Sequence, residues 1–483
     1  MWLVIVLGVL LCLYGYFYRK FRHWSSRGVP TLEPSIPFGN IGNPLTRKRA
    51  FYESVAAVYD EFKNSAPYGG FYSLTIPHLV PIDIGLIKRI LLIDFGHFVD
   101  RGLFYNEEAD PLSANLFFIG GQRWRTMRQK LTSTFTSGKM QSMFAILTQC
   151  SGHLVNKLKH YHGDVREVLA CYSMEVIGSC AFGLDCGGLG SEESEFRRYT
   201  RKIFEYSPGK TLMRLASMLW PWWCQILGVK FIPQDVSDFF IEVVRDTIKM
   251  RREKGLKRND FLDILLELED QGLLDKKDFA AQSFVFFIAG FETSSTTLGY
   301  LLYELSRDIS IQRKCREEIR RTFPDGVLTY EKVMGMKYLD QVVEETLRLY
   351  PVLPFLNREC TEEYQVDENL TLKQGEKIII PTLALHMDPE YFPQPEVFDP
   401  ERFSAGRRDE IRGCTYMPFG EGPRKCIGLR FGLMQVKVGL VSILSKFEVS
   451  RTDGTPDKLV WDCNGFTLKS KQDIVLNFSE LKE

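Results

Sequence analysis

The sequence has no surplus of charge of either sign, because 61 Lys and Arg residues balance 61 Asp and Glu residues over 483 positions. Nucleic-acid-binding domains usually carry a basic excess, so we expect no nucleic-acid partner. The eleven cysteines include no C-x-x-C pair and no Cys/His cluster at zinc-ligand spacing, which excludes a zinc site and a regular disulfide framework. No repeat, low-complexity tract or glycine-rich dinucleotide fingerprint occurs either. The chain therefore carries no recognisable nicotinamide or flavin module of its own.

An uncharged apolar run opens the chain, from Trp2 to Tyr18. Helices of about 17 to 25 such residues cross a bilayer. Basic residues follow at positions 19, 20, 22 and 27 and place the remaining chain on the cytoplasmic side. A cleaved signal peptide is the alternative; it would need a basic residue before the run and a small-residue cleavage site after it, and neither is present. We predict a membrane-anchor helix over residues 1–20.

The segment after the anchor contains Pro30, Pro34 and Pro37, which predict a semi-rigid, basic and proline-rich linker over residues 21–45. Residues 46–483 show no second linker, so we expect one large domain. Helical periodicity dominates it, over residues 51–62, 122–131, 139–161, 234–252, 261–268 and 278–307. Strand patterns cover residues 71–76, 79–82, 377–380 and 473–477. The pattern predicts a mainly α fold with small peripheral β-sheets, and a central cofactor would help to hold together so large a core.

The most informative stretch is residues 418–428, Pro-Phe-Gly-Glu-Gly-Pro-Arg-Lys-Cys-Ile-Gly. Gly420, Gly422 and Gly428 can adopt φ angles closed to other residues and bring the backbone close to a flat ligand. Cys426 stands beside cations and before a helical pattern, and both features lower the pKa of a thiol. A thiolate in that setting suits a soft metal, whereas a buried structural cysteine is the alternative reading of Cys426 alone.

Five positions of this stretch resemble, in type and spacing, the haem loop of the cytochrome P450 family: Phe419, Gly422, Arg424, Cys426 and Gly428. The resemblance implies the cytochrome P450 fold and a haem b iron ligated by the Cys426 thiolate, a ligand that favours O–O cleavage. It also implies that Phe419, Gly420 and Gly428 contact the haem. One departure is Gly432, where the helix after this loop commonly has Ala.

A second motif lies in the middle of the helix expected over residues 278–307. Glu292 and Thr293 follow small residues in an otherwise apolar helix. A solvent-facing polar stripe is the alternative, but aromatic residues on both sides demand burial. The segment from Ala289 to Thr293 resembles the distal helix of the same family. The resemblance implies that Ala289 helps to form a groove over the haem and that Glu292 and Thr293 relay protons to iron-bound dioxygen.

A charged motif, Glu345 and Arg348, lies three residues apart on one predicted helix face and would ordinarily be a surface pair of little energetic value. Together with the later Arg402 it resembles the E-x-x-R signature and charged triad of the family. The resemblance implies that the three charges are buried together and support the haem loop.

The two propionates of haem need hydrogen-bond donors. Trp124 and Arg128 lie one helical turn apart, and both can donate to a carboxylate. Their W-x-x-x-R pattern is another family signature. Arg424 lies in the loop itself, and Arg101 and Arg358 fall where related membrane-bound members carry propionate ligands, although an isolated Arg is more often a surface residue.

The substrate side is expected to be apolar, which predicts a lipophilic, mostly neutral small molecule. By family position, the candidate pocket residues are Phe117, Phe118, Phe284, Phe287, Ala289, Val352, Phe355 and Phe466. Some of them could equally be ordinary core. A tryptophan-rich loop within residues 215–231 holds Trp220, Trp222 and Trp223. Because Trp favours the membrane interface, we expect this loop to dip into the bilayer.

Cations at Arg424, Lys425, Arg430 and Lys437 predict a basic face on the cysteine side of the haem, where an acidic electron donor could dock. Residues 135–139, Phe-Thr-Ser-Gly-Lys, and 357–360, Asn-Arg-Glu-Cys, resemble the microsomal, class II group and above all its insect and animal xenobiotic-metabolising branch. This resemblance implies an endoplasmic reticulum location. It implies NADPH-cytochrome P450 reductase as partner, with cytochrome b5 as an optional second electron donor.

The leading functional hypothesis is a monooxygenase that hydroxylates or epoxidises a lipophilic substrate. A haem-thiolate isomerase or dehydratase acting on peroxides is one alternative, although it would have less need of a proton relay. A haem-based binding or sensor protein without turnover is another, although a membrane anchor and a basic face would then lack a purpose.

Overall fold

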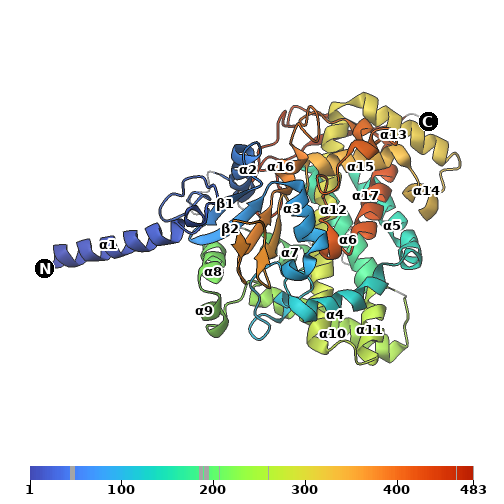
Figure 1. Ribbon diagram of the computed structural model, residues 1–483. Helices are drawn as coiled ribbons and strands as arrows, with labels where there is room; N and C mark the ends of the chain where they lie inside the picture. The colour runs from blue at the N-terminus through green and yellow to red at the C-terminus, as the bar shows by residue number, and fades with distance from the viewer. Residues whose placement is uncertain are drawn as a thin grey trace.

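The computed structural model describes residues 1–43, 49–183, 189, 195–205, 207–258, 260–463 and 465–481. Helices dominate these residues, and the first two strands lie near the N-terminal helix (Figure 1). The first nine helices are α1 (Trp2–Phe21), α2 (Phe51–Phe62), α3 (Ile84–Lys88), α4 (Gly121–Thr132), α5 (Ser137–Leu158), α6 (Val165–Ile177), α7 (Glu195–Phe204), α8 (Pro208–Leu219) and α9 (Pro221–Ile226). The later ones are α10 (Gln234–Lys254), α11 (Phe261–Asp270), α12 (Lys276–Arg307), α13 (Ile309–Thr322), α14 (Tyr330–Met334), α15 (Lys337–Leu349), α16 (Thr382–His386) and α17 (Leu429–Leu444).

The strands form three small sheets. The strands are β1 (Tyr68–Ser73), β2 (Ile76–Pro81), β3 (Leu356–Glu359), β4 (Tyr364–Gln365), β5 (Thr371–Leu372), β6 (Lys377–Ile380), β7 (Phe447–Arg451) and β8 (Leu476–Glu480). The largest sheet has the order β1-β2-β6-β3. Its β2 and β6 run parallel, with Leu79 opposite Ile378, whereas the other neighbours are antiparallel. The chain thus returns to its N-terminal hairpin after most of the helices have formed.

The long helix α12 lies at the centre of the main hydrophobic core. It packs against α6, α17 and α15, and against β7. Its middle turns contribute Phe284, Phe287 and Phe291 to the core, and Gly290 allows Ile177 of α6 to approach closely. α17 begins directly after the cysteine loop and packs on α12, so this contact holds the loop and the distal helix in one rigid core.

The mainly α fold with small peripheral sheets is confirmed, and most of the expected helices form within three residues of their predicted ends. The C-terminal strand forms at Leu476–Glu480, three residues later than predicted, because its pairing with β7 sets its register. The prediction of a loop over residues 215–231 is wrong. The end of α8 and the whole of α9 lie there, since Pro208 and Pro221 each occupy a first helical position.

The apolar helix α1 has no buried residues, and it is the helix in the described part of the chain that is long and apolar enough to cross a membrane. The segment that follows does not act as a free spacer. Trp24 is completely buried, Thr31 pairs with Gly70 of β1, and Arg27 forms an ion pair with Glu376. The base of the helix is therefore tied to the main sheet. The predicted boundary between residues 45 and 46 lies outside the described residues.

Candidate functional site

The loop before α17 folds through two glycines. Gly420 has φ +72° and donates its N–H to the Met417 carbonyl at 3.0 Å. Gly422 has φ +75°, and a Cβ placed there would lie 1.9 Å from the Leu91 carbonyl oxygen. The Cys426 N–H then donates to the Phe419 carbonyl at 2.9 Å, which closes the loop. Only glycine fits the close approach at position 422.

Gly428 does not adopt the glycine-specific φ that the sequence predicts for this loop. Its φ of −88° is open to any residue. It occupies the N-cap position of α17, and its backbone N–H donates to the Cys426 thiol. The special backbone angle predicted for Gly428 is therefore wrong, although its position directly after the cysteine loop is as expected.

Protein atoms surround the Cys426 thiol, although part of its side chain remains accessible. Burial raises its pKa above that of a free thiol, while the Gly428 N–H and the charges of Arg128 and Arg101 oppose that rise. The predicted net lowering is therefore not found in the protein alone. A bound metal ion deprotonates a coordinating thiol outright, so the ligand charge would come with the metal.

Arg424 is buried against the loop, and its guanidinium donates hydrogen bonds to backbone carbonyls. Its Nε donates to the Val99 carbonyl at 2.8 Å and its Nη2 to the Ile119 carbonyl at 2.9 Å. Its guanidinium lies 4.0 Å from the ring centre of Trp124 on α4. Arg424 therefore clamps the segment between residues 99 and 119 onto the cysteine loop.

Three further guanidinium groups gather beside this clamp. Arg128 donates from Nη2 to the Lys425 carbonyl at 2.8 Å, and Arg101 donates to the Phe117 carbonyl at 2.9 Å. Arg358 is only 2% exposed, and its Nε has no hydrogen-bond partner. Backbone pairing explains the grouping, because Asp100 and Glu359 form a β-bridge that places Arg101 beside Arg358.

These cations lack matching negative charge. The pKa of Arg424 falls to about 8, that of Arg358 to about 9 and that of Arg101 to about 10, in each case mainly through burial and further through the neighbouring guanidiniums. The carboxylate that faces them is Asp100, 3.7 Å from Arg424. Buried cations persist only when paired. The cluster therefore fits a ligand that brings its own carboxylates next to the Cys426 sulfur.

The distal helix α12 presents one accessible stripe. Ala289 is exposed despite its central position, and Val285 and Thr293, one turn to either side, are partly exposed. Thr293 donates its hydroxyl to the Ala289 carbonyl at 2.7 Å. Burial raises the pKa of Glu292, against the opposing charges of Lys469 and Arg166. A carboxyl group with a raised pKa holds a proton closer to neutral pH.

The phenylalanines predicted on this helix face the other way. Phe287 is completely buried among the rings of Phe182, Phe196 and Phe240, and Phe284 packs on Phe240. Phe287 is 0% and Phe284 6% exposed, so neither ring lies open beside Ala289, and their place in the substrate pocket stays a prediction. Val285 and Ile288 are partly exposed instead. Helical spacing from Ala289 and Thr293 would have identified this stripe.

The other predicted apolar residues come from three separate segments. Phe117 and Phe118 are half-buried and meet edge to face at 5.3 Å between ring centres. Val352 and Phe355 are nearly buried before β3. Phe466 is 48% exposed, and its ring centre lies 5.9 Å from that of Phe355. The structure thus brings Phe355 and Phe466 together, although they are far apart in sequence.

The three charged residues Glu345, Arg348 and Arg402 meet in the interior. Arg348 forms a fork with the Glu345 carboxylate, with both N–O distances 2.8 Å, and Arg402 approaches the same carboxylate at 3.3 Å. Arg348 also donates to the His386 carbonyl at 2.9 Å. His386 was not identified from the sequence, because a single histidine in a short helix carries no pattern.

The predicted basic face is smaller than expected. The side chain of Lys437 is completely buried and pairs with Asp340 at 2.7 Å, and Arg424 is buried as described. Lys437 therefore neutralises Asp340 on α15 and is not available to an electron-donor protein. Of the predicted cations, Arg430 is exposed and Lys425 is half-exposed.

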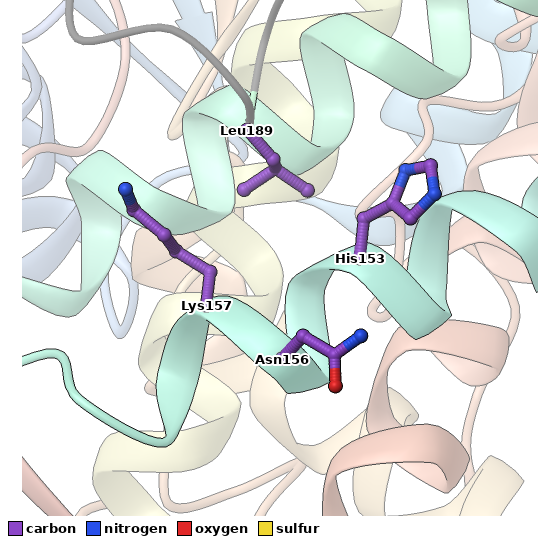
Figure 2. A pocket seen from close by; sticks show the side chains of 4 residues that line it. All are labelled: His153, Asn156, Lys157 and Leu189. Carbon is purple, nitrogen blue, oxygen red and sulfur yellow. The ribbon is translucent and has the colours of Figure 1, made fainter.

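A hollow of about 430 Å³ lies elsewhere, on α5, and is lined by His153, Asn156, Lys157 and Leu189 (Figure 2). None of the residues around Cys426 contributes to it, so it is separate from the cysteine site.

A single thiol beside several guanidiniums without matching negative charge suits a metal complex that carries two carboxylates of its own. Haem is such a complex, so the site is that of a haem-thiolate protein. The sequence model of the family described as Cytochrome P450 matches residues 33–477. The chain is 39% identical to "Probable cytochrome P450 6a21" of Drosophila melanogaster, over 98% of both chains. It is also 39% identical to "Cytochrome P450 6j1" of Blattella germanica, over 99% of this chain and 97% of that protein.

The chain therefore belongs to the cytochrome P450 family and is a haem-thiolate monooxygenase similar to insect members. We infer from the geometry that Cys426 holds the iron. We likewise infer that Arg101, Arg128 and Arg358, which lie beside that sulfur without matching negative charge, would bind the propionates.

Two glycines provide a matched test of the loop geometry. Gly422→Ala should prevent normal haem incorporation, because the added Cβ overlaps the Leu91 carbonyl. Gly432→Ala should raise the free energy of unfolding by about 1 kcal/mol, because an interior helical glycine is replaced and the nearest atom lies 3.8 Å away. Haem content and thermal unfolding measure both. Normal haem content in Gly422→Ala would contradict the argument.

Breaking the buried triad should be costly. Arg348→Ala removes the fork on the buried Glu345 carboxylate and leaves it the longer Arg402 contact and the Asp399 N–H, so it should lower the stability by about 3–5 kcal/mol and abolish haem retention. Arg408→Ala is the matched control. It removes a surface ion pair with Glu344, which lies next to Glu345 on α15, and should lower the stability by at most about 1 kcal/mol. Denaturant unfolding and haem content separate the two variants, and normal haem retention in Arg348→Ala would show that the triad is dispensable.

Proposed function

We propose that this monooxygenase is anchored in the endoplasmic reticulum membrane. We propose that it hydroxylates or epoxidises lipophilic small molecules with electrons from NADPH, delivered by NADPH-cytochrome P450 reductase. Bound haem supplies a thiolate-ligated iron that favours O–O cleavage. The observation that carries the proposal is the stripe of Val285, Ala289 and Thr293 on α12, where a small apolar surface adjoins a hydroxyl and an acid.

The acid and the hydroxyl have separate roles in this proposal. The raised pKa of Glu292 lets its carboxyl group hold a proton in the interior, and Lys469 and Arg166 keep that pKa from rising further. Thr293 presents its hydroxyl from the adjacent position, anchored by the Ala289 carbonyl. The pair would therefore take protons from the protein interior and deliver them at the apolar surface of α12.

The substrate class is proposed from the accessible aromatic side chains that the sequence assigns to the pocket. Phe117, Phe118 and Phe466 are accessible aromatic residues, and the Arg101 guanidinium is covered by the Phe117 ring at 4.1 Å. Aromatic walls without a free charge favour neutral, lipophilic molecules. Such substrates include plant toxins, insecticides and lipid-derived hormones, and a detoxifying or a biosynthetic role is compatible with the same walls.

Contact with the membrane is supported on a second element besides α1. Trp220, Trp222 and Trp223 are 58%, 64% and 54% exposed. Figure 1 shows α8 and α9 on the side of the molecule from which α1 extends. Exposed tryptophans are costly in water and favourable at the bilayer interface. We infer that α9 rests in the membrane surface and that lipophilic substrates enter from the lipid.

Electron delivery would use the cysteine side of the haem site, away from α12. Lys425 lies in the loop itself, Arg430 is exposed on the first turn of α17, and Arg125 is exposed one turn before Arg128 on α4. These accessible cations lie on the cysteine loop and on two helices that contribute to the site, and such positive charge suits an acidic flavoprotein or cytochrome b5.

The function is tested by reductase-dependent turnover. Full-length protein with reductase should oxidise NADPH and form a hydroxylated or epoxidised product from a panel of lipophilic compounds. Cys426→Ser should remove the thiolate band of the ferrous carbon monoxide complex and all turnover, whereas Cys463→Ser should leave both intact. Peroxide rearrangement without reductase would favour an isomerase or dehydratase, and haem binding without any turnover would favour a sensor.

The membrane contact is tested by fluorescence. Full-length protein in vesicles with brominated lipid chains should show strong tryptophan quenching, and W220F/W222F/W223F should lose most of the quenchable signal apart from that of Trp2. W461F, at a partly buried site, should change it little. Equal quenching in the triple variant and the parent would rule out insertion of α9.

A further inference from the structure

The side chain of His386 joins the charged triad to the cysteine loop. It is completely buried at the end of α16. Its Nδ1 lies 3.1 Å from the Arg348 carbonyl oxygen, and its Nε2 lies 2.8 Å from the Met417 backbone nitrogen. Arg348 belongs to the triad, and Met417 begins the turn that leads to Cys426. The imidazole ring is thus a direct bridge between them.

The partners determine the proton position on the ring. A backbone N–H can only donate, so the Nε2 of His386 must accept the hydrogen bond from Met417. Nδ1 then carries the hydrogen and donates it to the Arg348 carbonyl. Both ring nitrogens are satisfied, and the ring is neutral. Burial and the nearby Arg348 charge support this assignment, because they lower the pKa of His386 to about 3.

The bridge continues through the backbone of the loop. The Met417 carbonyl accepts from the Gly420 N–H at 3.0 Å, and the Phe419 carbonyl accepts from the Cys426 N–H at 2.9 Å. On the other side, the His386 carbonyl accepts from the Arg348 guanidinium. The ring is also held flat by Tyr416, with ring centres 5.4 Å apart and planes 28° from parallel. An unbroken series of contacts therefore runs from the buried charges to the sulfur.

We propose that neutral His386 is a positioning residue that fixes the cysteine loop to the charged triad and so keeps the Cys426 sulfur in register with the iron. The inference rests on ligation of haem by Cys426 and is independent of the substrate and of the reductase. Loss of the bridge leaves the Met417 N–H without a buried partner, which frees the start of the loop. The expected consequence is faster loss of the thiolate ligand from folded, haem-loaded protein.

Three variants separate the two ends of the bridge. In His386→Gln the side-chain amide oxygen reaches the place of Nε2 and can accept from Met417, while the bond to Arg348 is lost. In His386→Asn the amide occupies the place of Nδ1 and only the bond to Arg348 can form. His386→Phe keeps the ring shape and loses both bonds. His78→Phe is the matched control, since His78 is also buried with a pKa of about 3 but lies in β2 and does not contact the loop.

The readout is the rate at which the thiolate band of the ferrous carbon monoxide complex converts to the inactive short-wavelength band on mild heating. His386→Phe and His386→Asn should convert roughly tenfold faster than the parent, and His386→Gln within about threefold of it. His78→Phe should convert at the parent rate even where thermal unfolding begins earlier.

A parent-like rate in His386→Phe would overturn the proposal, as would a rate in His386→Gln equal to or greater than that in His386→Asn. If His386→Phe does not fold, the order of the Gln and Asn variants decides. Rates that simply follow the unfolding temperature across all four variants, the control included, would assign His386 to packing alone and likewise overturn it.

Discussion

The site is governed by positive charge that the protein gathers and does not neutralise. Arg101, Arg128, Arg358 and Arg424 approach one another in the interior, and Asp100 is the carboxylate that faces them. Their mutual repulsion is tolerable because backbone carbonyls hold several of their N–H groups in fixed directions. The remaining imbalance fits an anionic metal complex that brings its own carboxylates, and we infer that these groups form the receptor for haem.

Two rigid connections hold this receptor in place. Gly422 lets the cysteine loop pass under the Leu91 carbonyl, which seats the loop against the turn that follows α3. The buried fork between Arg348 and Glu345 holds α15, and His386 carries that support to Met417. A buried ion pair contributes little net stability, so its value here is that it admits one arrangement of the loop. Stability and positioning are therefore supplied by different groups.

The sequence predicts those parts of the site in which residue type and spacing are set by local geometry. The cysteine loop and the Glu345–Arg348 pair are of this kind, since a tight turn needs glycine and a helix face needs a spacing of three. The direction in which a side chain points depends on packing partners that the sequence does not name. The sequence predicts that Phe287 contacts the substrate, but its ring packs against Phe182 in the core. It predicts that Lys437 faces an electron donor, but its ammonium group pairs with Asp340 in the interior.

The parallel pairing of Leu79 with Ile378 has a consequence for biosynthesis. The N-terminal hairpin is synthesised early, but its next strand is made about 300 residues later. At translation rates of about 5–20 residues per second, the open edge of β2 waits on the order of 15 to 60 seconds. During that interval an unpaired strand edge invites pairing with other chains. The edge of β2 is thus protected only once residues 377–380 have been synthesised and have paired with it.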